Sequence, residues 1–228
     1  MWRYLNRQGL KLRSARGQQF SPDPAYQAKL IDLEMARWEA RRYPRSVAAV
    51  FIDERGFSRW PEPGLGGGAE PAVADRLGSN NGLWRLIGGL NAVTGRVDYL
   101  DNYIAGPAKV IESYGELVGA YPQAEAAYVT QDNGSIHKNP EVLEALRQWP
   151  AVQPVWLPTY APWLNPIEKL WRWLKQDVLK LHRLADNGEG LRRRVRDWRG
   201  QFQGGAQRLL EYVGLLGNGR LAQMTHAP

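Results

Sequence analysis

Cysteine is absent from this chain, and histidine occurs only three times in 228 residues. Without thiols the chain forms no disulfide, no zinc–thiolate centre and no cysteine nucleophile, which favours a reducing compartment. Long apolar runs are also missing. The longest, at residues 47–52, is far too short to cross a bilayer, and the basic segment after Met1 lacks a signal-peptide core. We therefore expect a cytoplasmic protein.

Positive charge exceeds negative charge, with a formal net charge of +7 and a sequence pI near 9.7. The charges are segregated: residues 1–16 contain no acid, residues 17–168 carry a net charge of −5, and residues 169–200 carry +6. A basic balance favours a polyanionic partner such as DNA. An acidic centre between basic ends fits a metal-binding centre flanked by DNA contacts, and it equally fits ordinary solvated helix faces.

Apolar residues make up 43% of the chain, enough for one substantial core and a smaller appendage. Short apolar runs typical of buried strands alternate with amphipathic segments typical of helices. Strands are expected at residues 47–52, 83–93, 96–104, 126–130 and 152–157, and helices at 26–42, 107–121, 141–149 and 189–202, before a Leu-rich tail helix. This order predicts an α/β mixed sheet with helices packed on it.

Two connections have distinctive chemistry. Four glycines fall between residues 61 and 71, together with three prolines, and this composition predicts a mobile loop. Asn165 and Pro166 predict the start of a further helix, with Asn165 as its N-cap and Pro166 at its first position. Apolar residues then recur along one side of that helix, which predicts a buried face.

Three carboxylates stand at the edges of the expected elements. Asp53 follows the strand at 47–52, Asp132 follows the strand at 126–130, and Glu168 lies in the first turn of the helix after Asn165. Side chains at such edges converge while the backbone stays rigid. Oxygen ligands without cysteine favour Mg²⁺ or Mn²⁺ over zinc. Glu54, next to Asp53, should point to the opposite face of the sheet.

Each carboxylate also has an ordinary structural interpretation. Asp132 begins an Asp-Asn-Gly turn, Glu168 would complete a capping box with Asn165, and Asp53 would simply end a strand. Taken singly, these interpretations are favoured over a catalytic one, because short motifs often match by chance. The sequence around all three carboxylates reverses that preference.

Three blocks carry a family resemblance: VFIDE at residues 50–54, TQDNGSIHK at 130–138 and LPTYAPWLNPIEKLW at 157–171. They resemble bacterial insertion-sequence transposases of the mariner-like DDE superfamily, in the insertion-sequence six-thirty group. The resemblance implies a ribonuclease-H-like fold, a mixed five-stranded sheet flanked by helices. It also implies that Asp53, Asp132 and Glu168 are the catalytic and metal-binding triad.

The resemblance implies an activity as well. A transposase of this kind cuts and joins DNA with two Mg²⁺ or Mn²⁺ ions held by the triad. Its implied partners are the terminal inverted repeats of the transposon, target DNA and a second copy of the chain, in the bacterial cytoplasm at the nucleoid. Two alternatives stay open: a nuclease of the same fold that only hydrolyses DNA, and an inactive DNA-binding remnant.

Residues near the third carboxylate are candidates for DNA contact. Three prolines between residues 158 and 166 are expected to hold an extended, stiff path that delivers Glu168 to a fixed place. Arg172 and Lys175 follow on the same face of the helix, where they suit phosphates flanking the cut, or a solvated face. Trp171 and its aromatic neighbours recur at helical spacing, which predicts packing in the core more often than stacking on bases.

Other DNA-binding candidates lie after Asp132 and near the N-terminus. Asn133, His137 and Lys138 follow Asp132, although a lone histidine is more often a packing residue. Residues 2–10 resemble the last helix of a helix-turn-helix region, and the basic residues nearby are Arg3, Arg7, Lys11, Arg13 and Arg16. We expect residues 1–20 to be a remnant of that region, 21–45 a linker and helix, and 46–228 the catalytic domain.

Overall fold

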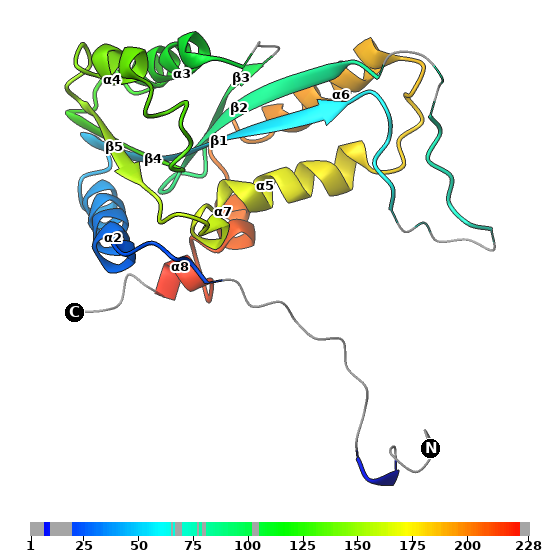
Figure 1. Ribbon diagram of the computed structural model, residues 1–228, viewed down its shortest axis with the longest axis horizontal. Helices are drawn as coiled ribbons and strands as arrows, with labels where there is room; N and C mark the ends of the chain where they lie inside the picture. The colour runs from blue at the N-terminus through cyan, green and yellow to red at the C-terminus, as the bar shows by residue number, and fades with distance from the viewer. Residues whose placement is uncertain are drawn as a thin grey trace.

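The computed structural model describes residues 7–9, 20–64, 66, 70–76, 78, 81–101 and 105–223. Its centre is a five-stranded sheet with the strand order β3-β2-β1-β4-β5 (Figure 1). The strands are β1 (Val47–Ser58), β2 (Leu83–Asn91), β3 (Val97–Asp101), β4 (Ala126–Gln131) and β5 (Val152–Trp156). The helices are α2 (Tyr26–Arg42), α3 (Pro107–Ala120), α4 (Pro140–Leu146), α5 (Ile167–Leu174), α6 (Gly188–Gly200), α7 (Gln207–Val213) and α8 (Arg220–Gln223).

Strand β1 lies in the middle of the sheet and has a different kind of partner on each side. It pairs antiparallel with β2 and parallel with β4, and β2–β3 and β4–β5 continue those two patterns outward. Residues 48–52 of β1 are all buried, as a strand covered on both faces requires. The predicted mixed sheet is therefore confirmed.

The end of β1 differs from the prediction. Pairing with β4 stops at Phe51 and Thr130, but pairing with β2 continues to Ser58 and Leu83. Asp53 is therefore an interior residue of a long strand, and the prediction that it follows the end of the strand was wrong. It nevertheless lies just beyond the parallel part of the sheet, because the pairing between β1 and β4 ends at Phe51 and Thr130.

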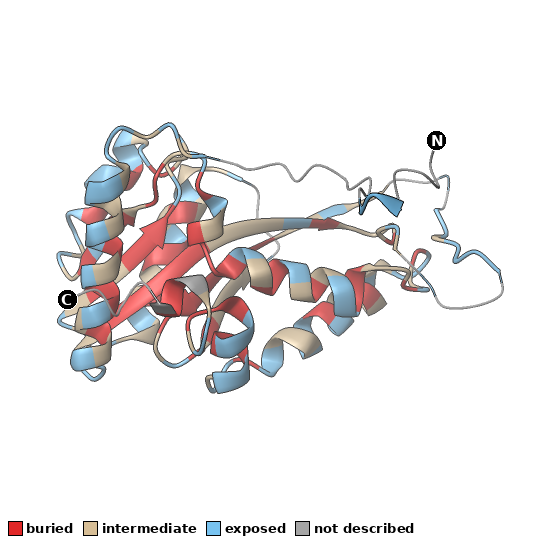
Figure 2. Ribbon diagram, turned by 90° about the horizontal axis from the view of Figure 1, so that it is seen from below, coloured by how far each residue is buried: buried red, intermediate tan, exposed pale blue. Residues whose placement is uncertain are grey.

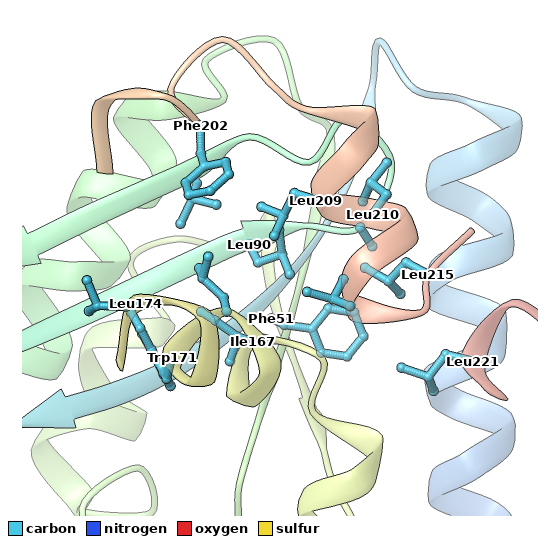
Figure 3. Packing of buried hydrophobic residues seen from close by; sticks show 14 of the residues in the cluster. Phe51, Leu90, Ile167, Trp171, Leu174, Phe202, Leu209, Leu210, Leu215 and Leu221 are labelled. Atoms are coloured by element: carbon cyan, nitrogen blue, oxygen red, sulfur yellow. The ribbon is translucent and has the colours of Figure 1, made fainter. Parts of the chain in front are cut away.

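Helices cover both faces of the sheet, and each face has its own apolar core. Helices α3 and α4 pack on one face around Val50, Val129 and Tyr114. The opposite face, which carries α5 and α7, holds the larger cluster, seen in Figure 3 as Phe51 and Leu90 against Ile167 and neighbouring leucines. Figure 2 shows the middle of the sheet as buried, whereas the far part of the long strands is only partly covered.

Most predicted elements coincide with observed ones within a few residues, and the helix at 26–42 coincides with α2. The start of α5 is an exception. Asn165 makes no capping hydrogen bond; a 3-10 turn at Pro162–Leu164 buries it, and the helix begins at Ile167. Asn165 was therefore wrongly predicted as the N-cap. At its other end α5 continues as a π-helix, Lys175–Leu179.

Several sequence predictions fall wholly or partly outside the described residues. Arg3, Lys11, Arg13 and Arg16 lie outside them, whereas Arg7 is described and exposed. Of the glycine-rich stretch, the described part includes Glu62, whose backbone pairs with Lys180. Within the described residues no helix is long and apolar enough to cross a membrane.

The buried face of α5 should dominate the stability of the larger core. Leu170 is fully buried on α5, whereas Leu143 on α4 is 42% exposed. We expect Leu170→Ala to lower the free energy of unfolding by about 2–5 kcal/mol, through lost burial and the cavity left behind. Leu143→Ala, the matched helical control, should cost under about 1 kcal/mol. Urea unfolding curves measure both changes, and equal losses would contradict this packing.

Candidate active site

Asp53 is held by a residue from the opposite layer of the fold. Its Oδ2 accepts a hydrogen bond of 2.9 Å from the indole Nε1 of Trp171, which is buried in α5. Gly88 is the direct cross-strand neighbour of Asp53 in β2. A Cβ at Gly88 would lie 2.6 Å from the Trp171 ring, so glycine leaves the room that the ring occupies. The indole thus reaches Asp53 across a gap in the side chains of β2.

Asp132 sits immediately after β4, as predicted. Its Oδ1 accepts a 2.8 Å hydrogen bond from the backbone N–H of Gly134, and its side chain is 65% exposed. The preceding residue, Gln131, is fully buried and accepts a 2.6 Å hydrogen bond from the Tyr114 hydroxyl. Asn133 donates its side-chain N–H to the Leu157 carbonyl. The backbone around Asp132 is therefore fixed on both sides, while its carboxylate faces solvent.

Glu168 is exposed in the first turn of α5, one helical turn before Trp171. The same short helix therefore delivers the third carboxylate and the hydrogen-bond donor to the first one. The path into α5 is fixed by turns: the N–H of Ala161 donates to the Pro158 carbonyl at 3.2 Å, and the N–H of Asn165 donates to the Pro162 carbonyl at 3.0 Å. The connection between β5 and the helix is therefore folded through turns, and the prediction of an extended path was wrong.

Asp53, Asp132 and Glu168 line a single cavity of about 360 Å³. The rest of its wall comes from residues 133–134 and from the connection between β5 and α5. The three charges act on one another: burial, followed by the negative charge of Glu168 and then that of Asp132, raises the pKa of Asp53 to about 7. The hydrogen bond from Trp171 opposes this rise but does not cancel it.

The donor set in this cavity suits a hard divalent cation. It consists of carboxylate oxygens, and no described basic residue forms an ion pair with Asp53 or Glu168. The geometry is open, however. Among the described residues no group of three or more acidic, histidine or cysteine side chains already surrounds one ion position. The Asp132 and Glu168 side chains are both exposed, so both have freedom to turn toward Asp53.

The predicted residues after Asp132 contribute differently. His137 is buried, with its Nε2 3.6 Å from Asp132, and burial lowers its pKa against the opposing charges of Asp132 and Glu54. Strand β1 runs through both Asp53 and Glu54, so the alternation of a strand still predicts that Glu54 points to the other face. Lys138 is exposed, with its ammonium 5.2 Å from the centroid of the Trp156 ring.

The two basic residues predicted on the face of Glu168 do not behave alike. Arg172 is exposed, forms no ion pair with any described residue, and lines a neighbouring cavity together with Glu168 and Lys169. Lys175 instead forms an ion pair with Glu62, which also binds Arg55 at 3.0 Å. Lys175 therefore already has an intramolecular partner, and Arg172 is the better placed of the two for a phosphate.

Sequence reasoning missed two groups that shape the site. The sequence predicted Trp171 as a core residue but gave no sign of its hydrogen bond to Asp53. Gly88 could not be singled out from the sequence, because its role depends on the register between β1 and β2. The second group is a set of contacts to Thr159, whose N–H donates to Asp23 at 2.8 Å and whose carbonyl accepts from the Ser21 hydroxyl at 2.5 Å. The segment before α2, through Ser21 and Asp23, therefore holds Thr159 in place, and Thr159 is part of the cavity wall.

The strand order and the carboxylates from β1, the end of β4 and α5 define a ribonuclease-H-like catalytic domain. The chain belongs to the DDE superfamily endonuclease family, whose model matches residues 48–192. The predicted family is confirmed, and that match includes Asp53, Asp132 and Glu168.

Individual relatives agree with this assignment. The "Insertion element IS630 uncharacterized 39 kDa protein" of Shigella sonnei is 29% identical over 105 residues, which cover 46% of this chain and 31% of that protein. This chain therefore spans about a third of the length of the curated relative it matches.

Among solved structures, the Mos1 transposase paired-end complex with left transposon end matches 98% of this chain and 68% of its own, with a TM-score of 0.60 and 14% identity. The catalytic domain of Mos1 mariner transposase matches over 94% of this chain and all of its own, with a TM-score of 0.51 and 13% identity. At these identities the likeness shows the fold, and the predicted ribonuclease-H-like fold is confirmed.

The raised pKa of Asp53 should leave a mark on stability. Because this pKa lies above its ordinary value of 3.8, the folded chain binds the proton more tightly than the unfolded chain. In metal-free buffer, the unfolding free energy should therefore fall as pH rises from about 4 to about 7, and then level off. Asp53→Asn should remove this part of the fall in the unfolding free energy and be more stable than the parent at pH 8, by up to about 4 kcal/mol.

Urea unfolding with a chelator, from pH 4 to pH 8, measures the effect. Asp197→Asn, which changes an exposed carboxylate on α6, is the matched control and should follow the parent curve. An Asp53→Asn curve parallel to the parent across the whole range would contradict the electrostatic picture of the site.

Proposed function

We propose that this chain is a DDE transposase that catalyses divalent-metal-dependent cleavage and strand transfer of an insertion sequence, with Asp53, Asp132 and Glu168 as its catalytic residues. The observation that carries the proposal is the convergence of these three carboxylates, from distant parts of the chain, on one cavity, where burial and the charges of the other two raise the pKa of Asp53. A cluster of like charges without paired cations is costly unless a ligand compensates it.

The relatives support the chemistry. The insertion element protein of Shigella sonnei and the Mos1 transposase are named for mobile DNA, and Mos1 complexes with transposon-end DNA, with Mn and with Mg share this fold. We infer that the triad of this chain holds two Mg²⁺ or Mn²⁺ ions. Bound ions would activate the attacking hydroxyl and stabilise the charge that develops on the leaving oxygen.

The chain's own residues prepare the site for that chemistry. Trp171 donates to one oxygen of Asp53, and a hydrogen bond from the backbone of Glu54 also acts on this carboxylate, so its orientation is fixed. Glu168 has a fixed backbone, because the turns before α5 leave it little freedom. Asp132 supplies an adjustable ligand, since its side chain is exposed and gives up the bond from Gly134 and the contact with His137 when it turns.

The proposed partner is DNA, at the transposon ends and at the target. The net positive charge supports this, and Arg172, which forms no ion pair with any described residue, lines the same cavity as Glu168. We include Lys138, His137 and Asn133 as contacts near Asp132, and Lys175 as a contact that must first leave Glu62. The N-terminal residues Arg3, Arg7, Lys11, Arg13 and Arg16 are proposed to contact DNA as part of residues 1–20.

Nicking of supercoiled plasmid DNA tests the catalytic assignment. With Mg²⁺ or Mn²⁺ the chain should nick the plasmid, and a chelator should abolish the reaction. Asp132→Asn or Glu168→Gln should lower the nicking rate on the order of a thousandfold, because the three carboxylates act as one unit. Glu54→Gln, which changes the neighbour of Asp53 on the other face, is the control and should nick within about threefold of the parent rate. Unchanged nicking by Asp132→Asn would mean that the active site lies elsewhere.

A pre-cut DNA end added to a target plasmid distinguishes strand transfer from hydrolysis alone. Covalent joining of the end to the plasmid supports the transposase, whereas nicking without joining identifies a nuclease. A chain that binds DNA and does neither would be an inactive remnant.

We also propose that the chain works as a homodimer on DNA, in keeping with the paired-end complexes of Mos1. Light scattering of the chain bound to a short duplex should give the mass of two chains. A mass equal to one chain at saturating DNA would contradict the dimer.

A further inference from the structure

Tyr160 adopts a backbone conformation that tyrosine normally avoids. Its φ is 54°, and among the described residues Leu181 is the one other residue besides glycine with a positive φ. Tyr160 is the third residue of the turn that the Ala161-to-Pro158 hydrogen bond closes. Turns with a positive φ at that position select glycine or asparagine, because a Cβ is crowded there. A tyrosine at this place costs stability that a glycine would not cost.

The surroundings of the turn hold this conformation in place. Asp23 accepts from both the backbone N–H and the hydroxyl of Thr159, at 2.8 Å and 3.2 Å, and Lys29 binds the same carboxylate at 2.7 Å. The Ser21 hydroxyl donates to the Thr159 carbonyl. Residues next to Tyr160 are therefore fixed from outside the turn, which is how a strained residue persists in a folded protein.

The side chain of Tyr160 is not used by the fold. It is 76% exposed, the most exposed of the described large hydrophobic residues, yet Tyr160 lines the cavity that contains Asp53, Asp132 and Glu168. An aromatic ring held at the edge of such a cavity, on a fixed turn, offers a flat face to whatever enters. Nucleobases bind to exposed aromatic rings by stacking, with little dependence on base identity.

We propose that Tyr160 is a nucleobase-binding platform, on which a base next to the phosphate at the carboxylates stacks. The inference rests on the proposed function for the identity of the ligand, DNA. The proposal adds Tyr160 to the residues that contact the substrate. It also gives a reason for the strained backbone of Tyr160: the turn position favours glycine, but the aromatic ring is needed beside the cavity.

Two variants separate the ring from the turn. Tyr160→Gly removes the ring and suits the positive φ, so its melting temperature should equal or exceed that of the parent. Tyr160→Phe keeps the ring and loses only the hydroxyl. Leu181→Gly is the matched control, because it relieves the other positive φ at a residue that does not line the cavity. Tyr160→Asn, which also tolerates a positive φ, replaces Tyr160→Gly if that chain fails to fold.

The probes are a short single-stranded oligonucleotide with one 2-aminopurine and the same oligonucleotide with an abasic site at that position, each titrated in Ca²⁺. The parent should bind the intact probe about tenfold more tightly than the abasic one, as one stacked base provides. Tyr160→Gly should bind both probes equally, with affinity for the abasic probe unchanged, whereas Tyr160→Phe and Leu181→Gly should match the parent. Equal affinity of the parent for both probes, or a Tyr160→Phe variant as weak as Tyr160→Gly, overturns the proposal.

This result is separable from the catalytic one. If Asp132→Asn abolishes nicking while the parent does not distinguish the two probes, the nucleobase platform is wrong and the triad stands. If the parent distinguishes the probes but Asp132→Asn nicks like the parent, the platform stands and the catalytic proposal fails.

Discussion

The hydrogen bond from Trp171 to Asp53 is the contact on which the geometry of the site depends. It joins the central strand to α5, the helix that also carries Glu168, so the carboxylate of Asp53 and the backbone of Glu168 are held in one frame. The contact requires Gly88, because any side chain at that cross-strand position would occupy the space of the indole. Gly88, which lies in β2 and carries no catalytic side chain, thereby helps to position Asp53 and the helix that carries Glu168.

Electrostatics gives the site its second property. Three carboxylates around one cavity repel one another, and the partly desolvated Asp53 takes up a proton in response, so its pKa reaches about 7. A divalent cation would reverse this balance by compensating the charge. The metal-free site therefore lowers the stability of the fold, and a bound metal ion would restore it. The side chain of Asp132 is exposed in the structure.

The sequence was sufficient to predict the sheet, most helices and the three carboxylates, because strand patterns and the blocks around Asp53, Asp132 and Glu168 are local signals. Contacts between distant segments could not be predicted in this way. The partner of Lys175 is Glu62, more than a hundred positions earlier, and the anchor of Thr159 is Asp23. The bond between Trp171 and Asp53 likewise follows from strand register and not from spacing along the chain.

The position of a bound metal ion tests this account most directly. In crystals of the chain soaked in Mn²⁺, anomalous scattering should place manganese between the carboxylates of Asp53, Asp132 and Glu168, with Asp132 turned away from the N–H of Gly134. Trp171 should still donate to Asp53 in that structure. Manganese bound elsewhere, with the three carboxylates still apart at saturating metal, would contradict the central claim that they form one metal-binding site.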